Sequence, residues 1–526
     1  IQIEQHAENR IITVIIEPSQ YLSIIDHDLL IGHVTAKTTD WQEIGTRVEG
    51  AFGIVRSNEN VVELLTDLTA SRCIWYCIHK NHLLVSSSQR LIVKLLGDFK
   101  PNLETAKWML SSGTIAPGQS WDSRIHSVPI NSTVTFERST GKKSSSSQQI
   151  NFNLSERSAH VVIEEIAEKL PQIVSATIPN QKGVLLPLSG GYDSRSLLLL
   201  LKDKSKLKTV TWGDHELEHH PNGDAAIAKK IADRVGVSNE FHPLNKETSP
   251  FKNRFEAFVL ASEGRSDNFS GYLDGLNLWN KLKNEGAQLL IRGEEGFGWN
   301  QAYTEFDAMR TLGITDLRKS SNYDDFPSLK LLQPTIPSHF GRKEGETIPA
   351  WRDRLYYEFR LPFVMASLNS ISTKFMEIRT PFLSSDLLRR VMELPDSERT
   401  EKKWFTTMVD RFNIDVPFAS QYCQKSLSDE LKDPPALNYL NDVLQNKLPS
   451  EFEIFESLKK NLYPIKQTGQ STRSPISYLK SLLPLRLRSA YRNYFSKPSI
   501  DPIMLAFRIA IIATIEKKIS DDLQNN

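Results

Sequence analysis

One glycine-rich stretch holds the residues best suited to chemistry. It follows an apolar run and reads, in order, Ser189, Gly190, Gly191, Tyr192, Asp193 and Ser194. Two glycines let backbone N–H groups approach a ligand, and the start of a following helix adds the positive end of its dipole and a serine hydroxyl. This pattern predicts a phosphate-binding loop. Because a carboxylate beside phosphate needs a divalent cation between them, Asp193 is a candidate metal ligand. A bare Gly-Gly pair could instead simply turn a strand into a helix.

The elements around this stretch alternate between strand and helix. Apolar runs predict strands at 184–188, 208–212 and 289–291, and helices at 197–201 and 225–235. A further helix is predicted where apolar residues recur at helical spacing between Val162 and Val174. Strands that alternate with helices form parallel sheets with right-handed crossovers. The fold class expected here is therefore α/β, with the glycine-rich stretch at the carboxyl end of a strand.

The Ser-Gly-Gly-x-Asp-Ser string resembles the pyrophosphate loop of the N-type ATP pyrophosphatases. Three later segments, 224–236, 293–298 and 376–383, follow in the order of the asparagine synthase-like family, which includes asparagine synthetases, β-lactam synthetases and lasso-peptide cyclases. The resemblance implies ATP and Mg²⁺ as cofactors. It also implies a reaction in which a carboxylate attacks the α-phosphate of ATP, pyrophosphate leaves, and ammonia or an amine displaces AMP to form an amide.

The resemblance also assigns roles to residues outside the loop. Trp212 and Gly213 match the position that contacts adenine, and Gly293 begins a shortened form of the family's acidic glycine loop. Glu294, where the family usually has Asp, joins Asp193 as a metal ligand; a solvated turn carboxylate is the alternative.

Two further residues are implied to be catalytic. Glu377 matches the family's site glutamate and would act as the general base, unless it pairs with Arg379 or another cation. Lys425 resembles the lysine that stabilises charge near the α-phosphate, although Cys423 replaces part of its usual flanking pattern, and a surface lysine is the alternative.

Residues 11–137 have the period-two pattern of an antiparallel sheet, and the polar run 139–149 is expected to be an exposed loop. Parts of this region resemble a glutaminase-like β-sandwich. A glutaminase needs an N-terminal cysteine nucleophile, and Ile1 is not one; a truncated N-terminus is the competing explanation. Cys73 and Cys77 are expected to be buried, inert thiols. We therefore expect a degenerate glutaminase-like domain, with ammonia or an amine supplied by another route.

Composition narrows the remaining possibilities. Lys and Arg total 64 against 63 Asp and Glu, which gives no general attraction to nucleic acid or to an anionic membrane. Three cysteines suit a reducing compartment, and the cytoplasm is expected. The apolar stretch 503–515 is too short to span a bilayer and predicts a core helix. Residues 457–500 contain no Asp or Glu and nine Lys and Arg, so they form either a solvated helix face or a surface for an acidic partner.

The expected organisation is a glutaminase-like domain at 1–152, an ATP-binding synthetase domain at 156–410 and a helical extension at 411–526. The expected function is ATP-dependent amide-bond formation through an acyl-adenylate, with a lactam-forming cyclase of a peptide or small molecule as one alternative. An inactive nucleotide-binding homologue is another. His215 and His219 have the spacing of a zinc protease motif, but Gly213 before them and Pro221 after them disfavour the required helix.

Overall fold

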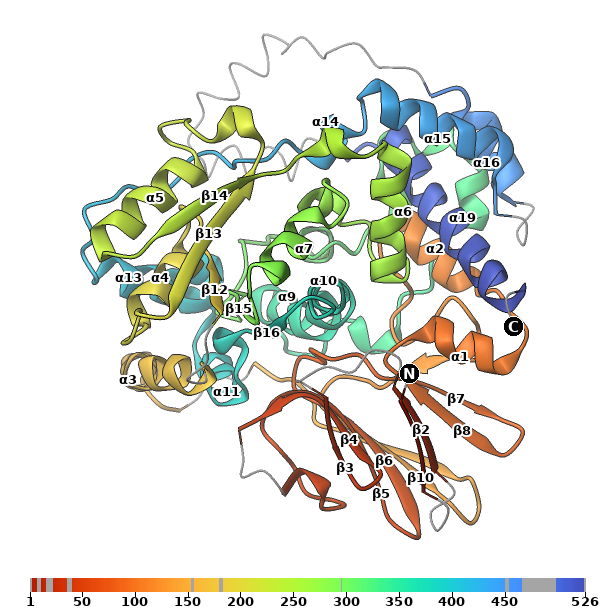
Figure 1. The fold of residues 1–526 in the computed structure, drawn as a ribbon, viewed down its shortest axis with the longest axis horizontal. Coiled ribbons are helices and arrows are strands. Elements are labelled where there is room, and N and C mark those ends of the chain that lie inside the picture. The colour runs from red at the N-terminus through yellow and green to blue at the C-terminus, as the bar shows by residue number, and fades with distance from the viewer. Residues whose placement is uncertain are drawn as a thin grey trace.

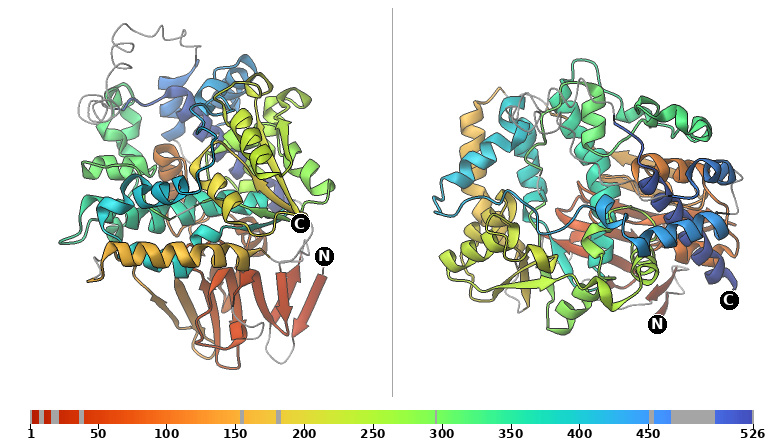
Figure 2. Two further views of the ribbon diagram at one scale, coloured as in Figure 1. Left: turned by 90° about the vertical axis from the view of Figure 1, so that its left-hand side faces the viewer. Right: turned by 90° about the horizontal axis from the view of Figure 1, so that it is seen from above.

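The computed structural model describes residues 2–6, 11–15, 22–35, 40–152, 156–178, 183–294, 296–449, 454–465 and 498–524. The chain is α/β: antiparallel sheets are formed by the N-terminal part, and a five-stranded parallel sheet with helices follows. The antiparallel sheets form a lower layer beneath the rest of the molecule (Figure 1, and Figure 2, left).

Two antiparallel sheets face each other in the N-terminal part. The larger has the order β11-β10-β6-β5-β4-β3 and the smaller the order β8-β7-β9, and β1 and β2 form a separate hairpin. A cluster that includes Leu64, Ile74 and Phe136 packs between the two sheets. The strands are β1 (Gln2–His6), β2 (Ile11–Ile15), β3 (Leu22–Ile25), β4 (Asp28–Val34), β5 (Gly50–Ser57), β6 (Val61–Thr66), β7 (Trp75–His79), β8 (His82–Ser86), β9 (His126–Ser127), β10 (Ser132–Glu137) and β11 (Lys143–Ser147).

The expectation of a loop at 139–149 is wrong. Residues 143–147 form β11, which pairs antiparallel with β10 at the edge of the larger sheet. All five residues of β11 are exposed, so no apolar alternation marks the strand in the sequence. Its backbone pairing to a well-patterned neighbour is what makes it a strand.

The parallel sheet has the order β14-β13-β12-β15-β16. Its strands are β12 (Val184–Pro187), β13 (Leu207–Gly213), β14 (Asn239–Pro243), β15 (Leu289–Ile291) and β16 (Glu377–Arg379). The first strand in the chain, β12, lies in the middle, with later strands added on both sides. Ligands of such sheets bind in the crevice beyond the carboxyl ends of the strands, where the strand order reverses. That crevice opens next to β12.

Helices cover this sheet and position the loop after β12. The helices α3 (Ala159–Thr177), α4 (Tyr192–Leu200) and α5 (Asp224–Val235) share a buried cluster with β12 and β15. All three predicted helices are confirmed within a few residues. Further along the chain lie α7 (Asn277–Asn284), α8 (Glu305–Thr311), α9 (Ile348–Leu355), the π-helix η9 (Tyr356–Met365), α10 (Ala366–Ser372), α11 (Ser385–Glu393), α12 (Asp396–Arg399), α13 (Lys403–Asp410) and α14 (Leu427–Glu430).

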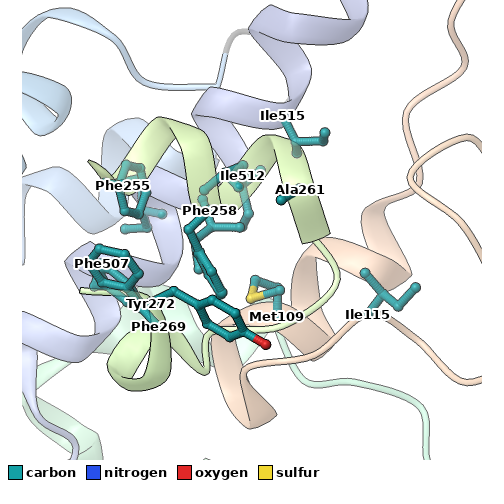
Figure 3. Packing of buried hydrophobic residues seen from close by; sticks show 14 of the residues in the cluster. Met109, Ile115, Phe255, Phe258, Ala261, Phe269, Tyr272, Phe507, Ile512 and Ile515 are labelled. Carbon is teal, nitrogen blue, oxygen red and sulfur yellow. The ribbon is translucent and has the colours of Figure 1, made fainter. Parts of the chain in front are cut away.

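The last helix joins distant parts of the chain. α19 (Pro502–Gln524) packs against α1 (Gln89–Leu96) and α2 (Leu103–Ser112) from the N-terminal part, and against α6 (Phe251–Ser262) and α15 (Pro434–Asn446). Figure 3 shows Phe507 of α19 beside Phe255 and Phe269, with ring centroids 5.3 and 6.1 Å away. The expected core helix at 503–515 is thus confirmed, and none of the helices in the described ranges is long and apolar enough to cross a membrane.

From α14 onward the described C-terminal part is mainly helical, and α16 (Ile454–Leu462) lies between α15 and α19. Residues 411–426 contain no helix. Most of the basic segment 457–500 lies outside the described residues, so the acidic partner stays a prediction. The domain limits at 152 and 410 stay predictions as well.

Candidate functional site

The loop after β12 together with the first turn of α4, residues 188–194, will be called the glycine loop. Its backbone N–H groups are held by the protein's own oxygens. Ser189 N donates to Ser194 Oγ (3.0 Å), Gly190 N to Asp224 Oδ1 (3.0 Å) and Gly191 N to Ser189 Oγ (3.3 Å). The Asp224 carboxylate lies in a poorly solvated place next to the loop, and this burial raises its pKa. The loop therefore presents donors that already bind one anionic group.

A segment from the C-terminal part, residues 416–425, crosses this edge of the sheet and will be called the strap. Phe418 is its anchor: the ring stacks on Tyr192 at 3.9 Å, and the guanidinium of Arg195 lies 3.9 Å from the ring centre. Arg195 also donates to the carbonyls of Val416 and Pro417. The side chains of α4 thus fix the start of the strap over the glycine loop.

Gly213 brings the strap close to the end of β13. Asp214 N donates to Cys423 O (2.7 Å), and a Cβ at Gly213 would lie 2.9 Å from Cys423 Cβ and closer still to its carbonyl oxygen. Real Cβ atoms essentially never approach this closely, so the position needs glycine for space rather than for its dihedral angles.

Between the strap and the sheet is a cavity of about 480 Å³, which will be called the loop cavity. Its walls include Leu188, Ser189, Trp212, Asp224 and Lys425. Its volume falls in the range of roughly 300–1,000 Å³ that is common for small-molecule sites. The structure therefore brings together the predicted residues Ser189, Trp212 and Lys425. The Lys425 side chain is 52% exposed and its Nζ lies 3.7 Å from Glu216, so it is able to move.

The two predicted metal carboxylates lie on neighbouring loops. A Cβ on Gly293 would lie 3.1 Å from Asp193, so the segment after β15 touches the glycine loop. Glu294 pairs with Arg292 through one oxygen, whereas its buried Oε2 has no hydrogen-bond partner within the part of the chain that the structure describes. Burial raises the pKa of Glu294 despite Arg292, and the Asp193 carboxylate adds to that increase.

Asp193 is held by a residue that the sequence did not reveal. The ammonium of Lys402 lies 3.1 and 3.2 Å from the two carboxylate oxygens of Asp193. Burial still raises the pKa of Asp193, although Lys402 opposes the effect. Lys402 comes from the turn before α13, more than two hundred residues away in sequence, and no local pattern marks it.

Asp193 and Glu294 could hold a Mg²⁺ ion only together with ligands from a bound molecule. Among the described residues, no group of three or more His, Cys, Asp or Glu side chains could hold a metal ion alone. Mg²⁺ is usually bound by one or two carboxylates together with substrate phosphates and water. Asp193 and Glu294, with an unpartnered oxygen on Glu294, match that requirement.

Glu377 is not brought to the loop cavity. It is the first residue of β16, level with Val184 and Leu289 at the amino ends of the neighbouring strands. Its buried carboxylate accepts from Arg72 (2.8 Å), and His33 Nδ1 lies 3.6 Å away. Burial alone would raise the pKa of Glu377, but Arg72 and His33 together lower it. Glu377 thus forms an ion pair, which was the alternative to a role as general base. Its cation, Arg72, belongs to the N-terminal part.

The zinc motif has no support in the structure. His215 begins η2 (His215–Leu217), a three-residue turn, and its side chain is 79% exposed. Cys77 is buried, as expected, whereas Cys73 is only partly buried. Burial raises the pKa of Cys73 to about 11 and also raises the pKa of Cys77.

No protein-family model matches this chain, and no curated protein is significantly similar to it.

Proposed function

We propose that this protein catalyses ATP-dependent amide-bond formation, in which a substrate carboxylate is activated as an acyl-adenylate. The observation that carries the proposal is the glycine loop at the switch point of the parallel sheet, with two carboxylates beside it and a cavity bounded by Trp212 and Lys425. The residue pattern that resembles the asparagine synthase-like family supplies the reaction class. The α/β fold is compatible with it.

In this proposal the glycine loop binds the phosphates of ATP. Its N–H groups, which now bind Asp224 and two hydroxyls, would turn to phosphate oxygens, and the N-terminus of α4 adds a favourable dipole. Asp193 and Glu294 would hold Mg²⁺, which neutralises the charge that develops on departing pyrophosphate. Lys402 would supply positive charge beside Asp193, and Lys425 would turn from Glu216 toward the phosphates, because positive charge placed where negative charge develops is usually the largest catalytic contribution.

Glu377 has a structural role in the proposal rather than that of the base. A general base works best with a pKa near the working pH and must reach the proton that it removes. The carboxylate of Glu377 is already bound by Arg72, and its pKa is lowered. The substrate amine would then lose its proton to another group or to water.

The test compares Asp193→Asn with the matched control Asp203→Asn, which changes an exposed carboxylate just beyond the same helix. Binding of Mg·ATP is measured first. Exchange of labelled pyrophosphate into ATP is then measured in the presence of a mixture of small carboxylic acids and amines. We expect Asp193→Asn to lose at least tenfold in both, and Asp203→Asn to match the original protein. Equal behaviour of the two variants would refute the assignment of the loop.

The contact between Lys402 and Asp193 favours one second candidate, a nucleotide-binding protein without the reaction, because the ammonium occupies the carboxylate that a metal would need. Tight ATP binding with no AMP formed from any acid and amine would identify it. A lactam-forming cyclase would instead give a product lighter than its single substrate by one water.

A further inference from the structure

A second cavity, of about 590 Å³, lies between the N-terminal sheets and η9, and will be called the η9 cavity. Residues of β7, the end of β11, the segment 338–343 and η9 line it. η9 is a π-helix ten residues long, and π-helical turns are rare and often found at functional sites. No residue lines both the η9 cavity and the loop cavity. It is therefore a separate site.

The walls of the η9 cavity are mainly apolar. They bring side chains from the smaller antiparallel sheet and its connections together with side chains of η9: Trp75, Ile115, Val128, Ile130, Pro362 and Phe363. An apolar cavity of this size with a few polar groups is the usual form of a small-molecule site.

Arg265 is the unusual member of the wall. Arg265 is only 4% exposed, yet no carboxylate of the described residues lies within 4.0 Å of its guanidinium. Its Nε donates to Ser262 O (3.1 Å), and the guanidinium lies 6.0 Å from the ring centre of Trp75. A buried charge is unfavourable unless it is paired and hydrogen-bonded.

Most other deeply buried arginines of the described chain have carboxylate partners, and Arg195 instead donates to the carbonyls of Val416 and Pro417. Arg352 and Arg399 each bind Asp353, and Arg354 binds Glu346 and Glu358. Among the described residues, Arg265 has neither a carboxylate within 4.0 Å nor the two carbonyls that Arg195 has, and its side chain lines a cavity. An anion that enters the cavity would supply the missing partner.

The other charged residues of the wall leave an excess of positive charge. Glu358 is the one acidic residue in the wall, and Arg354 neutralises it at 2.7 Å. Burial raises the pKa of Glu358, and Arg354 opposes that increase. Within the described ranges, the Lys343 ammonium binds two amide oxygens, from Asn151 at 2.9 Å and Gln149 at 3.5 Å, and no carboxylate lies within 4.0 Å of it. An anion is therefore attracted to this cavity, and a cation is not.

We propose that the η9 cavity binds an amphipathic organic anion, with its carboxylate or phosphate on the guanidinium of Arg265 and its apolar body against Trp75, Ile130 and Phe363. The indole N–H of Trp75, which has no acceptor in the described chain, is a further donor in the same wall. A charge-assisted hydrogen bond in an apolar setting gives both affinity and preference for the anion. The proposal does not depend on the function proposed for the loop cavity.

The test is calorimetric titration of the full chain with octanoate, octyl phosphate and octanol, which share one apolar tail. We expect one molecule of anion bound per chain, about 10- to 100-fold more tightly than octanol, the range that one charge-assisted hydrogen bond gives. Decanoate should bind more tightly than octanoate, by about fourfold for each methylene that is buried. The ratio between octanoate and octyl phosphate shows which anionic group the site prefers.

Two variants locate the binding. Arg265→Met should weaken octanoate at least tenfold, whereas the control Arg318→Met, at a side chain 64% exposed, should leave it unchanged. If Arg265→Met does not fold, Ile130→Trp fills the cavity and should abolish binding of both anions. No binding of either anion at millimolar concentration, equal affinity for octanol, or unchanged affinity in the variant that folds would overturn the proposal.

Discussion

Three glycine-to-alanine substitutions test whether the strap and the glycine loop form one binding site. They add the same methyl group to three backbones that have no positive φ, so only the space around the new Cβ differs. At Gly213 the Cβ would meet the backbone of Cys423 in the strap, and at Gly293 it would lie 3.1 Å from Asp193. At Gly271 there is nothing within 4 Å, which makes it the matched control.

The expected magnitudes follow from these distances. A methyl group forced into a packed site destabilises by about 1–3 kcal/mol, and Gly213→Ala should lie in that range because the two nearest atoms are the carbonyl carbon and oxygen of Cys423. It must also displace the strap and with it Lys425, so we expect Mg·ATP to bind at least tenfold more weakly. Gly293→Ala requires a shift of only a few tenths of an ångström. It should therefore alter nucleotide binding more than it alters the free energy of unfolding.

Urea unfolding gives the free energies, and fluorescence titration with an ATP analogue gives the dissociation constants. Gly271→Ala should be neutral or stabilising by about 0.4–1 kcal/mol, because it restricts the unfolded chain. The reasoning fails if Gly213→Ala destabilises the protein yet binds Mg·ATP as the original does, since the strap would then not belong to the site.

Three further substitutions or reactions probe single residues. Lys402→Met should raise the apparent Mg²⁺ affinity of the nucleotide-free protein, because the Asp193 carboxylate loses its ammonium partner; a Mg²⁺ titration followed by fluorescence checks this. The folded protein at pH 8 should react slowly with a disulfide reagent, and unfolding should release all its thiols, since burial raises the pKa of Cys73 to about 11, of Cys423 to about 12 and of Cys77. Glu377 has a lowered pKa in the folded state, so its ion pair with Arg72 stabilises the protein above the ordinary glutamate value and loses that effect as the pH falls through the folded value. Glu377→Gln should therefore lower stability at pH 7 and flatten the acid limb of the stability curve measured by urea unfolding.

The elements with strong local patterns were predicted correctly. β12, β13 and β15 are apolar runs, and α3 and α5 have clear helical periodicity. These elements bury one face or both, and burial of a face produces an apolar pattern that can be recognised within the element itself. The sequence therefore located the glycine loop between its strand and its helix without any long-range information.

The missed elements lack such patterns. β14 contains Asn239 and Glu240, β16 has only three residues, and β11 is polar throughout. All three are edge strands, which need a patterned face less than central strands do. Their existence depends on the backbone of a neighbour that is far away in sequence.

The same limit applies to the site. The sequence marked Asp193 and Glu294 but not Lys402, because a single lysine before a helix has no distinguishing context. It offered an ion pair with Arg379 or another cation as the alternative for Glu377, yet it did not identify Arg72, which lies 305 positions earlier. Arg265 gave no signal at all, since its significance comes from the carboxylate that its surroundings lack.

A continuous series of contacts connects the N-terminal sheets to the proposed metal carboxylates. Arg72 donates to Glu377 and to the carbonyl of Ile378, and so fixes β16. At the other end of β16, the carbonyl of Arg379 accepts from Arg292 N, and Arg292 pairs with Glu294. Removing one partner from a buried ion pair typically destabilises by about 3–5 kcal/mol, because the other charge stays buried. Arg72 is therefore placed to hold the edge of the parallel sheet in position. This gives the N-terminal part a structural role that requires neither a nucleophilic cysteine nor glutamine.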